Sequence, residues 1–337
     1  MKVFEIQESF GMDNLRPAER PDPTPGPGQV CVDVQAVSLN YRDLLMVRGH
    51  YNARQPLPLV PCSDGVGVVS AVGEGVQSVS VGDRVAGAFS QTWIAGPPTA
   101  AKLRGTLGGP LDGTLAEKVI LEADGAVRVP DYLSDVEAAT LPCAALTAWS
   151  ALVEQGRVTA GQTVLVQGTG GVSVFALQIA RTLGARVIAT SSSDSKLEQL
   201  REMGAWQTVN YAEDGKWAKT VRTMTGGAGV DHIVEVGGAG TLAQSLKAVS
   251  VGGTITVIGV LSGIASELNI IPILMQHVRL QGILVGSREG FDRMNLAFAS
   301  HKLRPVVDRV FPFEQAREAF DYMASGAHFG KVCIRVA

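Results

Sequence analysis

A glycine-rich turn, Gly168-Thr169-Gly170-Gly171-Val172-Ser173, follows a short apolar run at 163–167 and precedes a stretch with helical periodicity. A strand that enters a helix through such a turn is typical of dinucleotide-binding sites. One glycine permits the tight turn, a second lets the backbone approach a pyrophosphate, and the helix N-terminus supplies free N–H groups. Ser173 stands at the third glycine position of this pattern. An ordinary glycine turn is the alternative, but the context predicts a pyrophosphate site at Gly168, Gly170, Gly171 and Val172.

The end of the next expected strand, 186–190, indicates which nicotinamide cofactor would bind. A site for NAD has an acidic residue there that binds the ribose 2′-OH. Here the chain reads Thr190-Ser191-Ser192-Ser193, and Asp194 comes so late that it is better explained as a helix cap. The serine hydroxyls and the cation of Lys196 favour a 2′-phosphate. The alternative for Lys196 is a solvated lysine on the surface. We therefore predict NADPH, held by Ser191, Ser192, Lys196 and Tyr211.

The elements around these residues alternate strictly between strand and helix, which predicts βαβ units and a parallel sheet. The expected fold is α/β, with a doubly wound Rossmann domain over 124–286 and a β-rich catalytic domain made of 1–123 and 287–337. Strands are expected at 163–167, 186–190, 207–210, 232–236, 254–258 and 279–285, and helices at 172–183, 194–202, 217–224 and 241–249. A further helix is expected over 134–154, interrupted at Pro142, with helices near 289–300 and 313–324 and a last strand at 332–336.

Composition excludes several classes of protein. The 337 residues carry 29 basic and 32 acidic side chains, a net charge of −3 that is too balanced for a nucleic-acid or membrane-surface protein. No apolar run reaches about 18 residues, so no spanning helix is expected. Charged residues near the N-terminus argue against a signal peptide. The four cysteines show no pairing pattern, which favours reduced thiols and a cytoplasmic location.

Several motifs resemble the medium-chain dehydrogenase/reductase superfamily, and specifically its zinc-independent, quinone-oxidoreductase-like branch. Besides the glycine-rich turn they are Asn40-Tyr41-Arg42-Asp43, Asp64-Gly65-Val66-Gly67-Val68-Val69, Gly82-Asp83-Arg84-Val85, Leu141-Pro142-Cys143, Thr147-Ala148-Trp149, Gly204-Ala205 and Asn210-Tyr211. The resemblance covers nearly the whole chain. It implies that the β-rich domain is GroES-like, that the nucleotide domain follows it, and that the C-terminus returns to the first domain.

Zinc-dependent members of that superfamily carry a Cys, a His-Glu pair and a second Cys as catalytic ligands. In this chain Asn40 and Ser63-Asp64 stand at the first positions, and only Cys143 matches a ligand. One thiol cannot hold a metal that needs three protein ligands, and the five histidines lack ligand spacing, so no metal site is expected. The four-cysteine lobe is also missing, since 93–113 contains no cysteine.

Without a metal, the resemblance implies reduction of a quinone or an α,β-unsaturated carbonyl compound. Hydride from NADPH adds to the substrate, and hydrogen-bond donors near its oxygen suffice to stabilise the negative charge. Asn40 and Tyr51 match residues that face the nicotinamide and substrate, and are the candidate catalytic residues. A local cap and a loop anchor are the alternatives for them. Leu45 replaces a second tyrosine of some relatives, which favours a more apolar wall.

The resemblance also implies further cofactor contacts. Thr147 matches a residue that packs on the nicotinamide ring, and two segments match those that hold the carboxamide. Arg288 would pair with phosphate or substrate, and Lys331 with the pyrophosphate. The expected residues are Thr147, Gly259, Val260, Val285, Gly286, Arg288 and Lys331.

The resemblance implies that the edge strand expected at 279–285 pairs with the same strand of a second copy. An unpaired apolar edge would otherwise invite aggregation, so a homodimer is predicted. Two other functions remain open at this point: a zinc-free NADP-dependent alcohol or ketone oxidoreductase, and a non-catalytic NADPH-binding sensor or structural protein.

Overall fold

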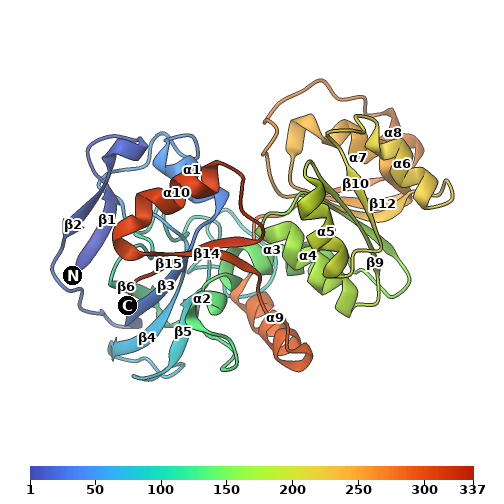
Figure 1. Ribbon diagram of the computed structural model, residues 1–337. Coiled ribbons are helices and arrows are strands. Elements are labelled where there is room, and N and C mark those ends of the chain that lie inside the picture. The colour runs from blue at the N-terminus through green and yellow to red at the C-terminus, as the bar shows by residue number, and fades with distance from the viewer. The chain divides into compact units, whose positions relative to one another are not determined.

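The computed structural model describes all 337 residues and divides into two compact units (Figure 1). The first unit consists of Met1–Leu146 and Val285–Ala337, and the second of Thr147–Leu284. This division differs from the predicted domain boundaries, which placed 124–146 with the nucleotide-binding domain. Those residues join the first unit because β7 (Ala126–Arg128) pairs with β5 (Arg84–Gly87), which extends the first unit's sheet.

The first unit is built on a mainly antiparallel sheet in the order β14-β15-β3-β4-β5-β7, with β6 also paired to β3 and a separate β1–β2 hairpin. Strand β15 pairs antiparallel with β3, so the C-terminal residues return to this unit as expected. Strand β14 was not anticipated from the sequence. The strands are β1 (Lys2–Ile6), β2 (Leu15–Glu19), β3 (Gln29–Ser38), β4 (Asp64–Val72), β6 (Lys118–Glu122), β14 (Val307–Pro312) and β15 (Lys331–Arg335).

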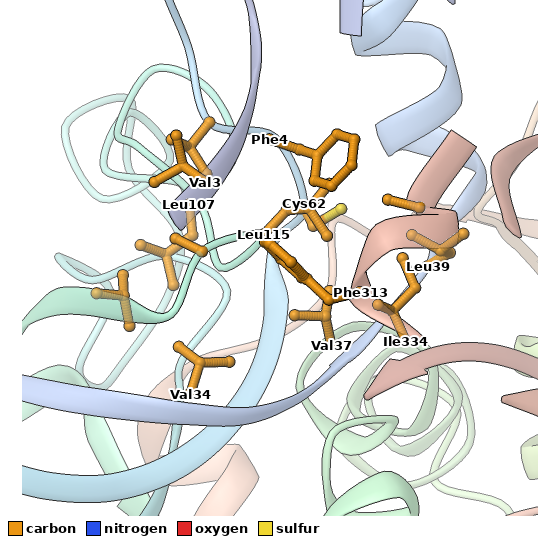
Figure 2. Packing of buried hydrophobic residues seen from close by; sticks show 14 of the residues in the cluster. Val3, Phe4, Val34, Val37, Leu39, Cys62, Leu107, Leu115, Phe313 and Ile334 are labelled. Atoms are coloured by element: carbon orange, nitrogen blue, oxygen red, sulfur yellow. The ribbon is translucent and has the colours of Figure 1, made fainter. Parts of the chain in front are cut away.

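Figure 2 shows the core of this unit, where residues far apart in the chain pack together. Phe4 meets Phe313 edge to face, with ring centroids 5.2 Å apart. Leu39 is buried in the same cluster and immediately precedes Asn40, which places that residue at the edge of the core. Helices of this unit are α1 (Tyr41–Val47), α2 (Asp135–Ala138), α9 (Arg288–His301) and α10 (Ala316–Ala324).

The second unit contains a six-stranded parallel sheet in the order β10-β9-β8-β11-β12-β13. The order reverses direction between β8 and β11, which is the doubly wound arrangement predicted from the alternating elements. Right-handed crossovers then place α4 and α5 on one face and α6 and α7 on the other. The strands are β8 (Thr163–Gln167), β9 (Arg186–Ser191), β10 (Gln207–Asn210), β11 (Val230–Glu235), β12 (Val249–Val257) and β13 (Arg279–Gly282).

The helices of the second unit agree with the predicted ones to within one residue at each end. They are α4 (Gly171–Thr182), α5 (Asp194–Glu202), α6 (Trp217–Met224) and α7 (Leu242–Ala248), with α3 (Leu146–Trp149) at the unit's start and a short α8 (Ile271–Met275).

The helical stretch Asp135–Glu154 departs from a regular α-helix, as the proline at position 142 suggested. Two π-helical segments, Leu141–Ala145 and Ser150–Glu154, flank α3. By length and composition this stretch could cross a membrane, contrary to the expectation from the sequence, but 72% of its most apolar window is buried in the protein. It therefore has the character of a core helix.

Candidate functional site

The glycine-rich turn forms an open surface at the end of β8. Gly168 has φ = 71°, a conformation that favours glycine, and Gly170 is the N-cap of α4. A Cβ added at either glycine would meet nothing within 4 Å. The Ser173 hydroxyl donates to Gln167 O over 2.5 Å, so the serine at the third glycine position closes the turn onto the strand. An exposed backbone at a helix N-terminus fits the pyrophosphate of a dinucleotide.

The buried carboxylate of Glu235, which was not predicted from the sequence, connects the end of β8 to the backbone that follows β11. One oxygen accepts from the backbone N–H groups of Gly237 (2.9 Å) and Gly238 (3.0 Å), and the other accepts from Gln167 Nε2 (2.8 Å). The peptide N–H of Gly259 donates to Glu235 O over 3.3 Å. One residue thus holds both the end of β8 and the 259–260 segment.

The 259–260 segment requires its glycine. A Cβ on Gly259 would lie 2.4 Å from Val236 O, so no other residue fits there without movement of the backbone. The next side chain, Val260, is 40% exposed. The segment follows β12 at the carboxyl edge of the sheet, which is where ligands bind in open parallel sheets.

The residues expected to choose between cofactors gather at the ends of β9 and β10. Ser191 is the last residue of β9, and its carbonyl accepts from the N–H of Tyr211 over 3.0 Å. The Tyr211 side chain is exposed, and Lys196 lies half-buried in the first turn of α5. Asp194 accepts from Asn210 Nδ2 over 2.8 Å, so one oxygen of this carboxylate already has a partner.

In the first unit, a buried polar cluster brings together Asn40, Ser63, Asp64, Cys143 and Lys331. Asn40 follows β3 and caps α1, with its N–H donating to Asp43 Oδ2 over 2.9 Å. The Ser63 hydroxyl donates to Asp64 Oδ1 over 2.7 Å, and the Cys143 N–H donates to Asp64 Oδ2 over 3.1 Å. Lys331 Nζ donates to Asn40 Oδ1 over 2.6 Å. Segments up to 291 residues apart in the chain therefore converge on one point.

Burial dominates the electrostatics of this polar cluster. It raises the pKa of Asp64 to about 6, against the opposing charge of Lys331. It also raises the pKa of Asp43, despite the neighbouring Arg42, and raises that of the Cys143 thiol far above its usual range. The Cys143 thiol therefore keeps its proton at neutral pH and is a poor nucleophile.

The structure corrects the expected role of Lys331. The resemblance placed it near the pyrophosphate, but its ammonium is only 4% exposed and donates to Leu39 O and Asn40 Oδ1, both over 2.6 Å. Its place in β15, which pairs with the end of β3, directs it into the polar cluster. No local pattern in the sequence could have shown this contact.

Tyr51 is held by Arg42 at the border of the polar cluster. The Arg42 guanidinium lies 4.7 Å from the centroid of the Tyr51 ring and 5.3 Å from that of Phe89. Arg42 also donates to Asp43 Oδ1 (3.2 Å) and to Leu107 O (2.9 Å), and is itself buried. Tyr51 is 40% exposed, so its ring contacts a buried cation while part of the residue remains open to solvent.

Two residues with positive φ lie at the candidate site, and one of them, Val285, is a predicted cofactor-binding residue. Cys62, at φ = 72°, immediately precedes Ser63, and Val285 has φ = 53°, which is very unusual for a β-branched residue. Such strain is found most often at functional sites. Gly286 is buried beside Val285, and Thr147 is buried in α3. Arg288, expected at phosphate or substrate, pairs with Asp292 over 3.0 Å.

Comparison with known proteins identifies the family. Residues 26–131 match the family described as "Alcohol dehydrogenase GroES-like domain", and residues 171–300 match "Zinc-binding dehydrogenase". A zinc-type alcohol dehydrogenase-like protein of Schizosaccharomyces pombe is 42% identical over 98% of this chain and 97% of its own length. The chain belongs to the medium-chain dehydrogenase/reductase superfamily. It is an NAD(P)-dependent oxidoreductase with a GroES-like domain and a Rossmann-like parallel sheet, which confirms the predicted fold class.

Two solved structures of this superfamily match along their whole length. One is described as an NAD-dependent alcohol dehydrogenase, with 35% identity, full coverage of both chains and a TM-score of 0.91. The other is a mycobacterial protein complexed with NADPH, with 28% identity, full coverage of both chains and a TM-score of 0.84. The relatives thus include proteins associated with either nicotinamide cofactor.

The polar cluster of this chain does not fit the zinc ion that the family name implies. Of its side chains, Asn40 and Ser63 are neutral oxygen ligands of low affinity for zinc, which leaves only Asp64 and the thiol of Cys143 as ligand types that zinc prefers. The ammonium of Lys331 bonds the Asn40 oxygen that would face a metal. No group of three or more His, Cys, Asp or Glu side chains anywhere in the chain is arranged to hold a metal ion.

Proposed function

We propose that this protein is a metal-independent, NADPH-dependent reductase of quinones or α,β-unsaturated carbonyl compounds. The observation that carries the proposal is the donor set of the polar cluster. Where zinc-type relatives would polarise a carbonyl with a metal, this chain offers an amide, a hydroxyl and a lysine ammonium. The Asn40 amide, held by Lys331, can donate to an enolate or hydroquinone oxygen, but none of these groups supplies the Lewis acid that alcohol oxidation uses.

A bound NADPH would supply the hydride, and the side chains of this chain would bind and orient the acceptor. Asn40 and Tyr51 are the proposed donors to the substrate oxygen, where negative charge develops as the β-carbon is reduced. The Arg42 guanidinium packs against the Tyr51 ring, and Lys331 donates a hydrogen bond to the amide oxygen of Asn40. A donor held in place before the reaction costs no reorganisation when the charge appears.

The preference for NADPH rests on the end of β9. Its last residue is Ser191, followed by Ser192, with Lys196 in the next helical turn and Tyr211 alongside. A cation and hydroxyls suit a 2′-phosphate, whereas an acid suits an unphosphorylated ribose. The 28%-identical mycobacterial relative solved with NADPH is consistent with this preference.

A homodimer formed through β13 is also proposed. This strand is at the edge of the six-stranded sheet, and the segment that precedes it in the chain carries exposed apolar side chains. Leu274 is 75% exposed and Ile264 is 87% exposed. A bare strand edge flanked by large apolar side chains is an aggregation hazard unless a second copy covers it. A location in the cytoplasm is consistent with the four free cysteines.

A single-turnover experiment tests the proposed activity. Enzyme loaded with one equivalent of NADPH is mixed with a small panel of enones and quinones, and in parallel with saturated aldehydes and ketones, while nicotinamide absorbance is followed. The proposal expects oxidation of NADPH with the enones or quinones and little with the saturated carbonyls. Oxidation by saturated carbonyls alone would support the alcohol/ketone alternative. Tight binding of NADPH with no oxidation would indicate a non-catalytic protein.

A further inference from the structure

Lys331 and Asn40 form a buried contact that determines how the amide of Asn40 lies. Lys331 Nζ reaches Asn40 Oδ1 over 2.6 Å, and both side chains are at most 8% exposed. A lysine ammonium is a donor without any acceptor, so the atom that faces it must be the amide oxygen. The orientation of this amide therefore follows from the chemistry of its partner.

The NH2 group of Asn40 consequently lies on the other side, where its contacts are weaker. Asn40 Nδ2 is 3.5 Å from Ser63 Oγ, at the limit of a hydrogen bond. The Ser63 hydroxyl already donates its proton to Asp64 Oδ1 over 2.7 Å. Asn40 has two N–H groups, so one can bond a substrate oxygen in place of this long contact while the other faces the Asp64 carboxylate.

The charged groups near this amide have several partners, and the Asp64 carboxylate also accepts from the Asn40 side chain. Arg42 donates to Asp43 and to the carbonyls of Leu107 and Gly109. Asp43 also accepts from the backbone N–H of Asn40, and Asp64 accepts from the N–H of Cys143. Lys331 is thus the cation that bonds the Asn40 side chain directly.

We propose that Lys331 is the positioning residue of the substrate-oxygen site: it fixes the Asn40 amide with its N–H groups available to the substrate and strengthens them as donors. A positive charge on the amide oxygen polarises the amide and makes its N–H groups better donors. An internal cation thereby acts through Asn40 at the place where zinc-type relatives would use a metal. This inference rests on the proposed function, because Asn40 must act on the substrate for Lys331 to act through it.

A double-mutant cycle tests the inference in the full-length protein. Lys331→Met should lower kcat for enone reduction about tenfold or more. Loss of a donor that contacts the substrate oxygen directly costs roughly 10²–10³ in rate, and Lys331 acts on that oxygen only through Asn40. The Kd of NADPH should not change. In an Asn40→Ala background, Lys331→Met should have no further effect on kcat. Lys331→Arg should restore part of the rate, and Lys2→Met, an exposed lysine of the same unit, should match the wild type.

Selective labelling of asparagine side chains with ¹⁵N gives a readout that needs no turnover. The chain has six asparagines, so the Asn40 amide can be assigned by its absence in Asn40→Ala. Its resonances should shift in Lys331→Met, or in Lys331→Gln if the methionine variant does not fold. A purely structural role predicts equal losses of kcat in both backgrounds or an unchanged amide signal, and either result would overturn the inference. Absence of enone and quinone reduction in the wild type would instead refute the proposed function, and with it the substrate part of this inference.

Discussion

His232 provides a test of the second unit's stability, because its imidazole is buried in the parallel sheet. It lies on β11 between β8 and β12, and its ring packs so close to Gly156 that a Cβ there would be 2.5 Å from the ring. Burial, with a smaller contribution from the charge of Arg279, lowers the pKa of His232 from 6.5 to about 4. The folded protein therefore keeps this ring neutral under conditions in which the unfolded chain protonates it.

The sign and size of the effect follow from this difference. Between pH 6.5 and pH 4 the unfolded state binds a proton that the folded state does not, so stability is lost as pH falls through that window. Each pH unit is worth about 1.4 kcal/mol. The free energy of unfolding should therefore fall by about 3 kcal/mol between pH 6.5 and pH 4 from His232 alone.

Urea unfolding followed by tryptophan fluorescence measures the free energy of unfolding at each pH, because three of the four tryptophans lie in the second unit. His232→Gln should flatten the decline in stability toward pH 4 by about 3 kcal/mol relative to the wild type. His277→Asn, at an exposed histidine of the same unit, is the matched control and should leave the decline unchanged. An identical pH dependence in wild type and His232→Gln would show that the buried ring is protonated or solvated in the folded protein, contrary to this reasoning. The raised pKa of Asp64 acts in the opposite direction in the same pH range, but Asp64 is present in both proteins, so its contribution cancels in the comparison of wild type with His232→Gln.

Three further predictions concern the proposed function. Lys196→Ala should weaken NADPH binding roughly ten- to a hundred-fold, because one charge-assisted contact to the 2′-phosphate is lost. NADH binding should stay nearly unchanged in the same fluorescence titration. Equal weakening of both cofactors would mean that Lys196 does not bind the 2′-phosphate. Tyr51→Phe should lower kcat and kcat/KM together by about ten- to a hundred-fold, because Tyr51 is 40% exposed and water can partly replace its hydroxyl; a change in KM alone would assign the ring to substrate binding. Light scattering at micromolar concentration should give twice the 35.4 kDa chain mass, and Leu274→Asp should give the monomer; a monomeric wild type would contradict the proposed β13 interface.

Much of the second unit could be predicted from the sequence because its elements are encoded locally. The helix at 217–224 and the strands at 163–167 and 207–210 have the predicted bounds, since each is a short run with clear periodicity and turn residues at its ends. The glycine-rich turn was also recognisable, because its chemistry depends on adjacent residues.

The polar contacts that complete the candidate site could not be predicted in the same way. Lys331 and Asn40 are 291 residues apart, and only the pairing of β15 with β3 brings them together. The hydrogen bond between Gln167 and Glu235 depends on the parallel sheet, which places β8 beside β11, and the two residues share no sequence motif. The boundary at 124 was misplaced because the short β7 belongs to a sheet whose other strands lie far earlier in the chain.

Metal content measured together with enone reduction tests the central claim most directly. The purified protein is dialysed against a strong chelator, its zinc is quantified by elemental analysis, and NADPH-dependent reduction of the best enone or quinone is assayed before and after. The donor set around Asn40 and Lys331 predicts zinc far below one atom per chain and unchanged activity. Zinc near one atom per chain, whose removal abolishes activity and whose return restores it, would contradict the proposal of a metal-independent reductase.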